Sequence, residues 1–291
     1  MGAKAQLPQN AMPQNAMPLS GIKVLDLTSV IAGPYCSYHL ALMGAEVLKI
    51  EQPGSGDLAR QLGADPALNA INMGASYLGM SAGKQAMTLN LKTREGKAIL
   101  HELTGGADVL VENFRPGVMT RLELDDAALR SENPRLVYCA ISGFGQDSPL
   151  RENPAFDQIV QGLSGAMAST GDAETGPIRS GYPISDTVAG MNAAFAICAA
   201  LFQRERTGLG QFVDVSMLDA TFSIMGWLTT NQLVAGQAPV PSGNDNFTAS
   251  PSGSFRAADG LLNIAANKQQ QFEAFCRVVG RPGLVDDLRF Q

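Results

Sequence analysis

The sequence has few residues suited to several common chemistries. It contains only two histidines, His39 and His101, and each stands in a segment expected to be helical, so both are interpreted as structural rather than as general bases. The Gly-Lys-Ser/Thr phosphate loop, a Gly-x-Gly-x-x-Gly turn after the first strand, the His-Glu-x-x-His zinc pattern, the Gly-x-Ser-x-Gly elbow and metal-spaced cysteines are all missing. Nucleotide hydrolysis, zinc chemistry and serine hydrolysis are therefore disfavoured. No metal site is expected, and carboxylates or lysines must do the chemistry of any enzyme built on this chain.

Long runs of like charge and of apolar residues are also missing. The 21 basic and 27 acidic residues give a net charge of -6 without a basic run, which disfavours a nucleic-acid partner. No uncharged apolar stretch of about 18 residues occurs and the first residues lack the order of a secretory signal, so we expect a soluble protein without membrane contact. The four cysteines stand far apart, as buried thiols of a cytoplasmic protein do.

The order of apolar segments predicts alternating strands and helices. Residues 22–27 and 46–50 have the pattern of strands, on either side of an apolar helix that follows Gly33-Pro34. Similar units follow, with strands at 86–91, 108–112 and 135–141 and helices from Thr93 and at 125–131. This alternation is typical of an α/β protein with an open, mostly parallel, Rossmann-like sheet that has helices on both faces.

The second half predicts a long helix and then a change of domain. Small apolar residues repeat at three and four positions from Asp186 to Arg206, and a strand at 211–216 and an apolar helix containing Trp227 follow. A hairpin, 253–256 with 261–265, and a helix at 268–279 come last.

Four parts are expected along the chain. Residues 1–20 are polar and interrupted by proline, which predicts a disordered tail. Residues 21–235 form the large domain, and 236–252, rich in Gly, Pro, Ser and Asn, form a linker. Residues 253–291 begin a smaller α+β domain that ends without a clear finishing element, so we expect it to be truncated.

Four glycine-bearing segments fall at the carboxyl ends of predicted strands, where open α/β sheets bind their ligands. They are 30–34, 52–57, 113–117 and 142–145, and we expect them to line one cleft. The third contains Asn113, Phe114 and Arg115, with Arg121 just beyond it. An amide, an aromatic face and cations suit an adenine ring and phosphates. A turn with a helix-capping Asn explains the same residues equally well.

Asp186 stands where an irregular stretch, 181–185, enters the long helix. An N-cap is the ordinary structural interpretation. The functional interpretation uses the same geometry, because capping N–H groups and the helix dipole would keep the carboxylate ionised and competent as a nucleophile. The residues alone do not choose between these hypotheses.

Several ordered motifs resemble those of the class III CoA-transferase family, which includes formyl-CoA and carnitine CoA-transferases, from about Leu19 to Phe290. The matching pieces are 24–27 with 32–34, 44–51 with Gly54 and 56–57, 89–92, 111–117, 142–145, and Asp186 with 207–211. The resemblance implies that Asp186 attacks a donor acyl-CoA, forms a mixed aspartyl anhydride and then an aspartyl-CoA thioester, and passes CoA to an acceptor acid. The implied substrates are an acyl-CoA and a small carboxylic acid such as a dicarboxylate, with coenzyme A as substrate and no tightly bound cofactor.

The resemblance also implies which residues contact CoA. They are Val30, Ile31 and Ala32 in the first loop, Leu89 and Lys92 near the adenosine, and Asn113, Phe114, Arg115 and Arg121 around the phosphates and pantetheine, with Phe156 and Asp157 completing the set. Gln52 and Pro154 stand where some members carry basic residues.

Two other hypotheses stay open. α-Methylacyl-CoA racemases share the family's aspartate but need a histidine in a Gly-His-Asp segment, and this chain has Ala155-Phe156-Asp157, where Phe cannot carry a proton. The second is a non-catalytic CoA-binding fragment, since members are usually longer and have a closing segment that returns to the first domain. Members also pair, so the resemblance implies a homodimer, interlocked if the chain is full length.

Overall fold

The computed structural model describes residues 17–246 and 248–290, and these form two compact units. Unit 1 is the described part of Met1–Ser164 with Tyr182–Gly226, and unit 2 is Gly165–Gly181 with the described part of Trp227–Gln291. The sequence placed the linker at 236–252, whereas the division between the units falls at Trp227 and again around 165–181.

Only the end of the expected tail is within the described residues. Residues 1–16 lie outside them, and Met17 to Ser20 lie inside. The backbone N–H of Leu19 donates to the carbonyl of Met43 at 2.8 Å, and Leu19 packs against the core of unit 1. This short stretch therefore belongs to the folded unit.

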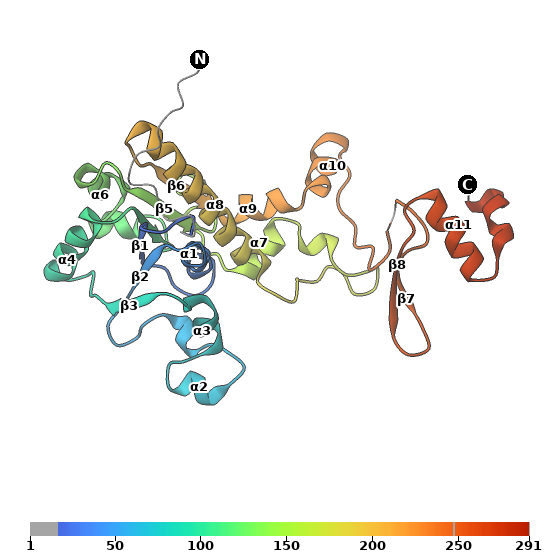
Figure 1. Ribbon diagram of the computed structural model, residues 1–291, viewed down its shortest axis with the longest axis horizontal. Helices are drawn as coiled ribbons and strands as arrows, with labels where there is room; N and C mark the ends of the chain where they lie inside the picture. The colour runs from blue at the N-terminus through green and yellow to red at the C-terminus, as the bar shows by residue number, and fades with distance from the viewer. Residues whose placement is uncertain (1–16, 247, 291) are drawn as a thin grey trace, which may run out of the picture. The chain divides into compact units, whose positions relative to one another are not determined.

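Unit 1 is built on a six-stranded sheet whose neighbouring strands all run parallel, in the order β3-β2-β1-β4-β5-β6 (Figure 1). The strands are β1 (Lys23–Asp26), β2 (Glu46–Glu51), β3 (Gln85–Thr88), β4 (Val109–Glu112), β5 (Val137–Ser142) and β6 (Phe212–Ser216). Each was predicted, and the α/β class with a Rossmann-like parallel sheet is confirmed.

Side chains alternate between the two faces of this sheet. Val24 of β1 and Val109 and Val111 of β4 join one apolar cluster, whereas their chain neighbours Leu25 and Leu110 join another. Because both faces are apolar, helices must cover both.

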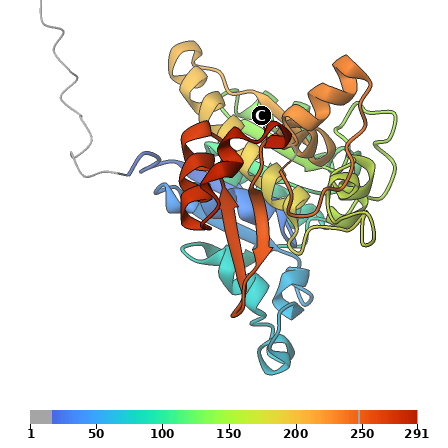
Figure 2. The same cartoon turned by 90° about the vertical axis from the view of Figure 1, so that its right-hand side faces the viewer.

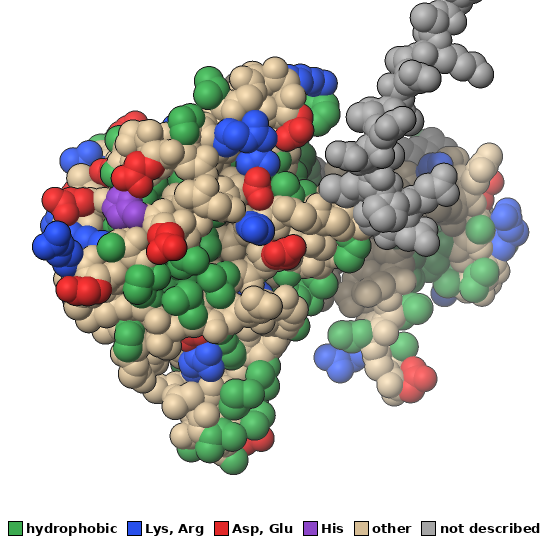
Figure 3. Space-filling view, turned by 60° about the vertical axis from the view of Figure 1, so that its left-hand side comes forward, with side chains coloured by type: hydrophobic (Ala, Val, Ile, Leu, Met, Phe, Trp, Pro, Cys, Tyr) green, Lys and Arg blue, Asp and Glu red, His purple; other side chains and the backbone are tan. Residues whose placement is uncertain are grey.

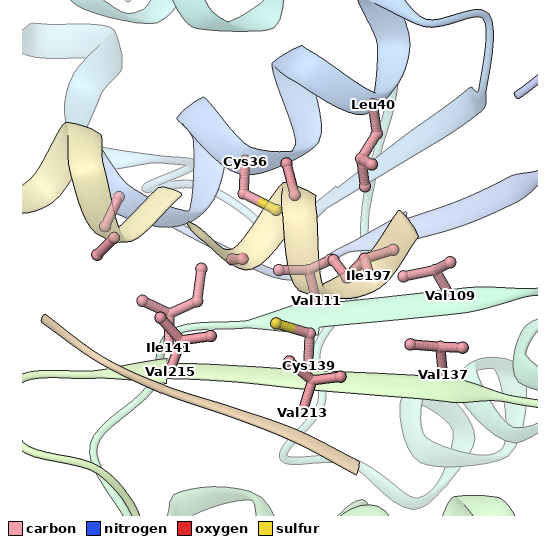
Figure 4. Close-up of a cluster of buried hydrophobic side chains, with 14 of the residues drawn as sticks. Cys36, Leu40, Val109, Val111, Val137, Cys139, Ile141, Ile197, Val213 and Val215 are labelled. Carbon is pink, nitrogen blue, oxygen red and sulfur yellow. The ribbon is translucent and has the colours of Figure 1, made fainter. Parts of the chain in front are cut away.

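The first face is covered by α1 (Ala32–Leu42) and α8 (Ile184–Thr207). Figure 4 shows Ile197 of α8 directed toward the valines of the sheet. The two helices approach closely at Gly190, where a Cβ would lie 2.4 Å from the carbonyl oxygen of Ala32. The small residues of α8 are what allow this approach.

The opposite face is covered by α4 (Arg94–Gly105) and α6 (Asp126–Glu132). Leu100 and Leu129, one from each helix, are fully buried against the sheet. The Thr93 hydroxyl accepts a hydrogen bond from the N–H of Gly96 and so caps α4 at the predicted start.

The remaining helices include several that the sequence patterns did not predict. These are α2 (Pro66–Ala70), α3 (Ala75–Ser81), α5 (Val118–Arg121) and α7 (Asp157–Leu163), with short 3-10 turns at Leu58–Gln61, Met167–Ser169, Pro282–Asp286 and Leu288–Phe290. The predicted apolar helix containing Trp227 is confirmed as α10 (Trp227–Ala235). A further helix, α9 (Met217–Ile224), precedes it, and the chain turns between them at Gly226, whose φ of +54° is a left-handed conformation that glycine adopts readily.

Unit 2 contains an antiparallel hairpin of β7 (Ser252–Arg256) and β8 (Leu261–Ala265), followed by α11 (Gln269–Val278). Figure 2 shows the hairpin and α11 in orange and red. Phe272 and Cys276 are the buried residues of α11. The predicted α+β elements of the smaller domain are confirmed.

The apolar character of α8 has a packing explanation. By length and composition alone it passes as a membrane-spanning helix, with a mean hydropathy of 1.5 over its most apolar window. It packs against α1 and against β5 and β6, as the core helix of an α/β unit does. Acidic and basic side chains are interspersed on the face drawn in Figure 3.

Candidate active site

A pocket of about 270 Å³ opens in unit 1 at the carboxyl ends of β1, β4 and β5. Strands β1 and β4 are neighbours although β2 and β3 lie between them in the sequence, so the strand order reverses here. Loops diverge at such a switch point, and open α/β sheets bind their ligands there. The pocket brings together eight predicted residues: Val30, Ile31, Ala32, Asn113, Phe114, Arg115, Phe156 and Asp186.

Ser29 and Asn113 tie the loop after β1 to the loop after β4. The N–H of Ser29 donates to Asn113 Oδ1, and Asn113 Nδ2 donates back to the carbonyl of Ser29, both at 2.9 Å. The side chain of Asn113 is therefore not a helix cap. It bridges the two strand ends that form one wall of the pocket.

Asp186 lies in the first turn of α8, half-buried and lining the pocket. The helix begins at Ile184, with Pro183 at the cap position, so the prediction that Asp186 is the N-cap was wrong. The capping oxygen comes from Asp157 of α7, whose Oδ1 accepts from the N–H of Ser185 at 2.8 Å and of Asp186 at 3.3 Å. The Asp186 carboxylate accepts no hydrogen bond from the residues that the structure describes, and it is left free for a ligand.

Burial and, to a smaller extent, the negative charge of Asp157 together raise the pKa of Asp186 to about 7. The expectation that capping N–H groups hold this carboxylate ionised was therefore wrong, since Asp157 receives those groups. A poorly solvated carboxylate with a high proton affinity is the stronger nucleophile once it is ionised. The arrangement suits Asp186 to attack an acyl carbon.

Two arginines share the pocket with Asp186. Arg115 follows β4, as expected, and Arg151 lies in the segment between β5 and α7. Pro154 stands where some members of the resembled family carry a basic residue, and it also lines the pocket. Arg151, three positions earlier, supplies a cation to the same pocket. No motif marked Arg151, and its only signal in the sequence is a positive charge between a strand end and Phe156.

Four predicted residues are not part of the pocket lining. Leu89 is buried after β3 and packs in the second apolar cluster, while Lys92 and Arg121 are exposed. Asp157 lies beside the pocket and acts on it through the first turn of α8. The roles of Leu89, Lys92 and Arg121 at a CoA site stay predictions.

The loop at 52–57 divides in the structure. Gln52 and Gly54 line a separate pocket beside Arg60. Asp57 turns the other way and accepts hydrogen bonds from the loop after β1. Three of the four predicted loops therefore line the site, and the fourth reaches it only through Asp57.

Neither histidine lines the pocket among the described residues. His101 Nδ1 lies 2.9 Å from Glu132 Oε2 on the surface of unit 1, and His39 stacks edge-on against Tyr35 and Tyr38. These contacts agree with a structural role for both.

Glu112, at the end of β4, is a buried carboxyl group close to the site. Burial raises its pKa to about 8, with a further contribution from the charge of Asp214, against the hydrogen bond it accepts from the N–H of Phe114. It therefore holds the loop that carries Phe114 and Arg115 largely as a neutral acid.

Comparison with known proteins bears on these features. A family model described as CoA-transferase family III matches residues 19–291. The chain is 37% identical to a succinate–glutarate CoA-transferase of Agrobacterium fabrum, over 94% of this chain and 69% of that protein. It is 41% identical to an acetyl-CoA:oxalate CoA-transferase of Acetobacter aceti, over 93% of this chain and 69% of that one. The crystal structure of a CAIB/BAIF family protein from Brucella suis superposes with a TM-score of 0.83 at 31% identity, covering 94% of this chain and 73% of that chain.

The fold and these likenesses define an α/β enzyme of the CoA-transferase class, whose substrates are CoA thioesters. The chain belongs to CoA-transferase family III.

Proposed function

We propose that this enzyme moves CoA between small dicarboxylic acids, with Asp186 as the covalent nucleophile. The observation that carries the proposal is the unbonded carboxylate of Asp186 in a pocket that also contains Arg115 and Arg151. Relatives named for succinate, glutarate and oxalate support dicarboxylates as substrates.

In the proposed first half-reaction, an Asp186 oxygen attacks the thioester carbon of the donor acyl-CoA. The C–S bond breaks, CoA leaves as a thiolate, and an aspartyl anhydride remains. The thiolate then attacks the aspartyl carbonyl carbon. This step releases the donor acid as a carboxylate and leaves Asp186 as an aspartyl-CoA thioester.

The second half-reaction runs the same steps in reverse with the acceptor. Its carboxylate attacks the aspartyl thioester and expels the thiolate, which then attacks the acyl carbon of the acceptor. A new acyl-CoA leaves and the carboxylate of Asp186 is restored. No proton is gained or lost over the cycle, so the absence of a histidine from the pocket lining is compatible with this chemistry.

Three features of the pocket favour the charged species in these steps. Arg115 and Arg151 line the same pocket as Asp186 and give it positive charge. Helix α1 starts at Ala32, beside the pocket, and no side chain among the described residues caps it, so its first N–H groups add positive potential. One of the two arginines can also bind the second carboxylate of a dicarboxylic acid, since a guanidinium binds a carboxylate in a bidentate manner.

We also propose that the enzyme acts as a homodimer. Met191, Phe195 and Phe202 follow one another along α8 and are 53%, 77% and 61% exposed. Exposed apolar stripes of this kind mark interaction surfaces. Light scattering of the wild type and of Phe195→Glu tests the proposal, and a wild type that is monomeric at all concentrations refutes it.

A screen of acyl-CoA and acid pairs by mass spectrometry tests the transfer. Product should form with dicarboxylic acceptors, should vanish in Asp186→Ala and should persist in the matched control Asp259→Ala, which changes an exposed aspartate of the β7–β8 turn. Full transfer by Asp186→Ala contradicts the proposal. In separate samples that contain the acyl-CoA but no acceptor acid, solvent deuterium exchange at the α-carbon would instead support a racemase.

A further inference from the structure

Val30 has an unusual backbone conformation at the wall of the pocket. Its φ is +72°, in the left-handed region that a β-branched residue adopts only under constraint. Val30 lies in the loop after β1 and lines the pocket with Ile31 and Ala32. Strained backbone at such a place persists only when surrounding contacts fix it.

The contacts that fix Val30 come from Asp57. Oδ1 of Asp57 accepts hydrogen bonds from the N–H of Val30 at 2.9 Å and from the hydroxyl of Ser29 at 2.8 Å. The same oxygen accepts from the N–H of Ala59 at 2.9 Å, which keeps Asp57 itself at the start of a helical turn. One carboxylate oxygen thus joins the loop after β2 to the loop after β1.

The other carboxylate oxygen of Asp57, Oδ2, forms an ion pair with Lys49. Lys49, which is fully buried on β2, places its Nζ 2.9 Å from Asp57 Oδ2 and 2.7 Å from the carbonyl of Thr28. Lys49 therefore reaches both the aspartate and the residue that begins the loop. Burial alone would raise the pKa of Asp57, but the charge of Lys49 and the hydrogen bond from Val30 outweigh it and hold that pKa below its usual value.

We infer that Asp57 is a positioning residue for the transfer reaction, which holds Val30 in its left-handed conformation and so sets the shape of the pocket wall that Val30, Ile31 and Ala32 form. The inference rests on the proposed function, because it assigns the held loop to the substrate site. It goes beyond that function, because Asp57 does not line the pocket and touches no reacting atom.

A purely structural role would be simpler, since Lys49 and Asp57 are a buried ion pair and removal of one partner destabilises the fold. Two observations favour positioning. Asp57 accepts hydrogen bonds from the loop that lines the pocket. One of them comes from the N–H of Val30, the residue of that loop that has a positive φ. Val30→Gly separates the two roles, because glycine adopts a positive φ without help.

The test compares Asp57→Glu in two backgrounds, with and without Val30→Gly. Glutamate keeps the charge beside Lys49 and displaces the oxygens by one methylene. We expect kcat/KM to fall on the order of 100-fold in the Val30 background and roughly 10-fold or less in the Val30→Gly background. Thermal unfolding should change equally in both. The matched control is Asp65→Glu, which makes the same change at an exposed aspartate that accepts a capping hydrogen bond from the N–H two residues on, at the start of α2.

Equal losses of kcat/KM in the two backgrounds would overturn the inference, as would a loss confined to the melting temperature. If Asp57→Glu fails to fold, Ser29→Ala, which removes one donor to Asp57 and leaves the ion pair, gives the same comparison. CoA binding by calorimetry keeps the test separate from the proposed function. A wild type that binds CoA but transfers it to no acid contradicts the proposed function. The role of Asp57 is then tested by CoA affinity: Asp57→Glu should weaken CoA binding in the Val30 background and not in the Val30→Gly background.

Discussion

The carboxylate of Asp157 accepts a hydrogen bond from the backbone N–H of Asp186, the residue proposed to attack the thioester. With the bond from Ser185, this contact caps the helix that presents the nucleophile. The charge of Asp157 also adds to burial in raising the pKa of Asp186 to about 7. Asp157 therefore positions Asp186 and adds to its proton affinity.

Replacement of Asp157 by asparagine should move the pH dependence of the enzyme. The amide oxygen can still cap α8, but the negative charge is gone, so the pKa of Asp186 falls toward its usual value. Ionised Asp186 is the reactive form, so we expect the acid limb of kcat/KM near pH 7 in the wild type and at lower pH in the variant. Rates between about pH 5 and pH 9 measure this. An acid limb that stays in place contradicts the electrostatic role of Asp157.

Asp186→Asn should stabilise the fold at pH 8 while it abolishes transfer. The pKa of Asp186 rises from 3.8 to about 7 on folding, so the folded state binds the extra proton between these values and stability falls as the pH rises through them. Removal of the charge should add about 1–2 kcal/mol to the free energy of unfolding at pH 8, after a discount for partial exposure. Urea unfolding should show this gain shrinking as the pH falls toward 4. A loss of stability at pH 8 is the opposite result.

The sheet could be predicted from the sequence because its strands are short aliphatic runs separated by turn residues, and that pattern is local. The start of α8 could not. Local spacing favoured Asp186 as the cap, whereas the cap comes from Asp157, 29 positions earlier in the chain, through a contact that only the tertiary fold creates. The pKa of Asp186 was misjudged for the same reason.

The site was predictable to the extent that it lies at strand ends. Val30 and Asn113 follow β1 and β4, and the parallel sheet brings them together. Arg151 carried no such signal, and Asp57, although it lies in the predicted segment 52–57 after β2, was not marked as the residue that joins that segment to the site. Arg151 lies in an irregular segment whose course the sequence patterns do not predict. Asp57 acts through the hydrogen bond that it accepts from the backbone N–H of Val30, 27 positions earlier in the chain.

Arg151→Ala should alter the choice of acceptor. If this guanidinium binds the second carboxylate of the acid, KM for a dicarboxylate should rise about 10-fold or more, while KM for a monocarboxylate of similar length changes little. Initial rates with paired acids measure the difference. Arg94→Ala, which changes an exposed arginine at the start of α4, is the matched control. Equal changes for both acids would show that Arg151 does not read the second carboxylate.

Gly190→Ala should loosen the packing of α1 on α8. The added Cβ would meet the carbonyl oxygen of Ala32 at 2.4 Å, so the helices must move apart. We expect a loss of about 1–3 kcal/mol in the free energy of unfolding, measured in urea. Gly105→Ala in α4, where a Cβ meets nothing within 4 Å, should be neutral or slightly stabilising. Equal effects of the two substitutions would contradict the close approach.

The most direct test of the account is to trap the activated carboxyl group of Asp186 with hydroxylamine, which attacks the aspartyl carbonyl of the anhydride or thioester and releases the donor acid or CoA. The protein is incubated with an acyl-CoA and hydroxylamine, digested, and the peptide that contains Asp186 is sequenced by mass spectrometry. The account predicts a hydroxamate on Asp186 that requires the acyl-CoA and is absent when Asp186 is replaced by Asn. An unmodified Asp186 in an enzyme that turns over, or a hydroxamate on another carboxylate, would contradict it.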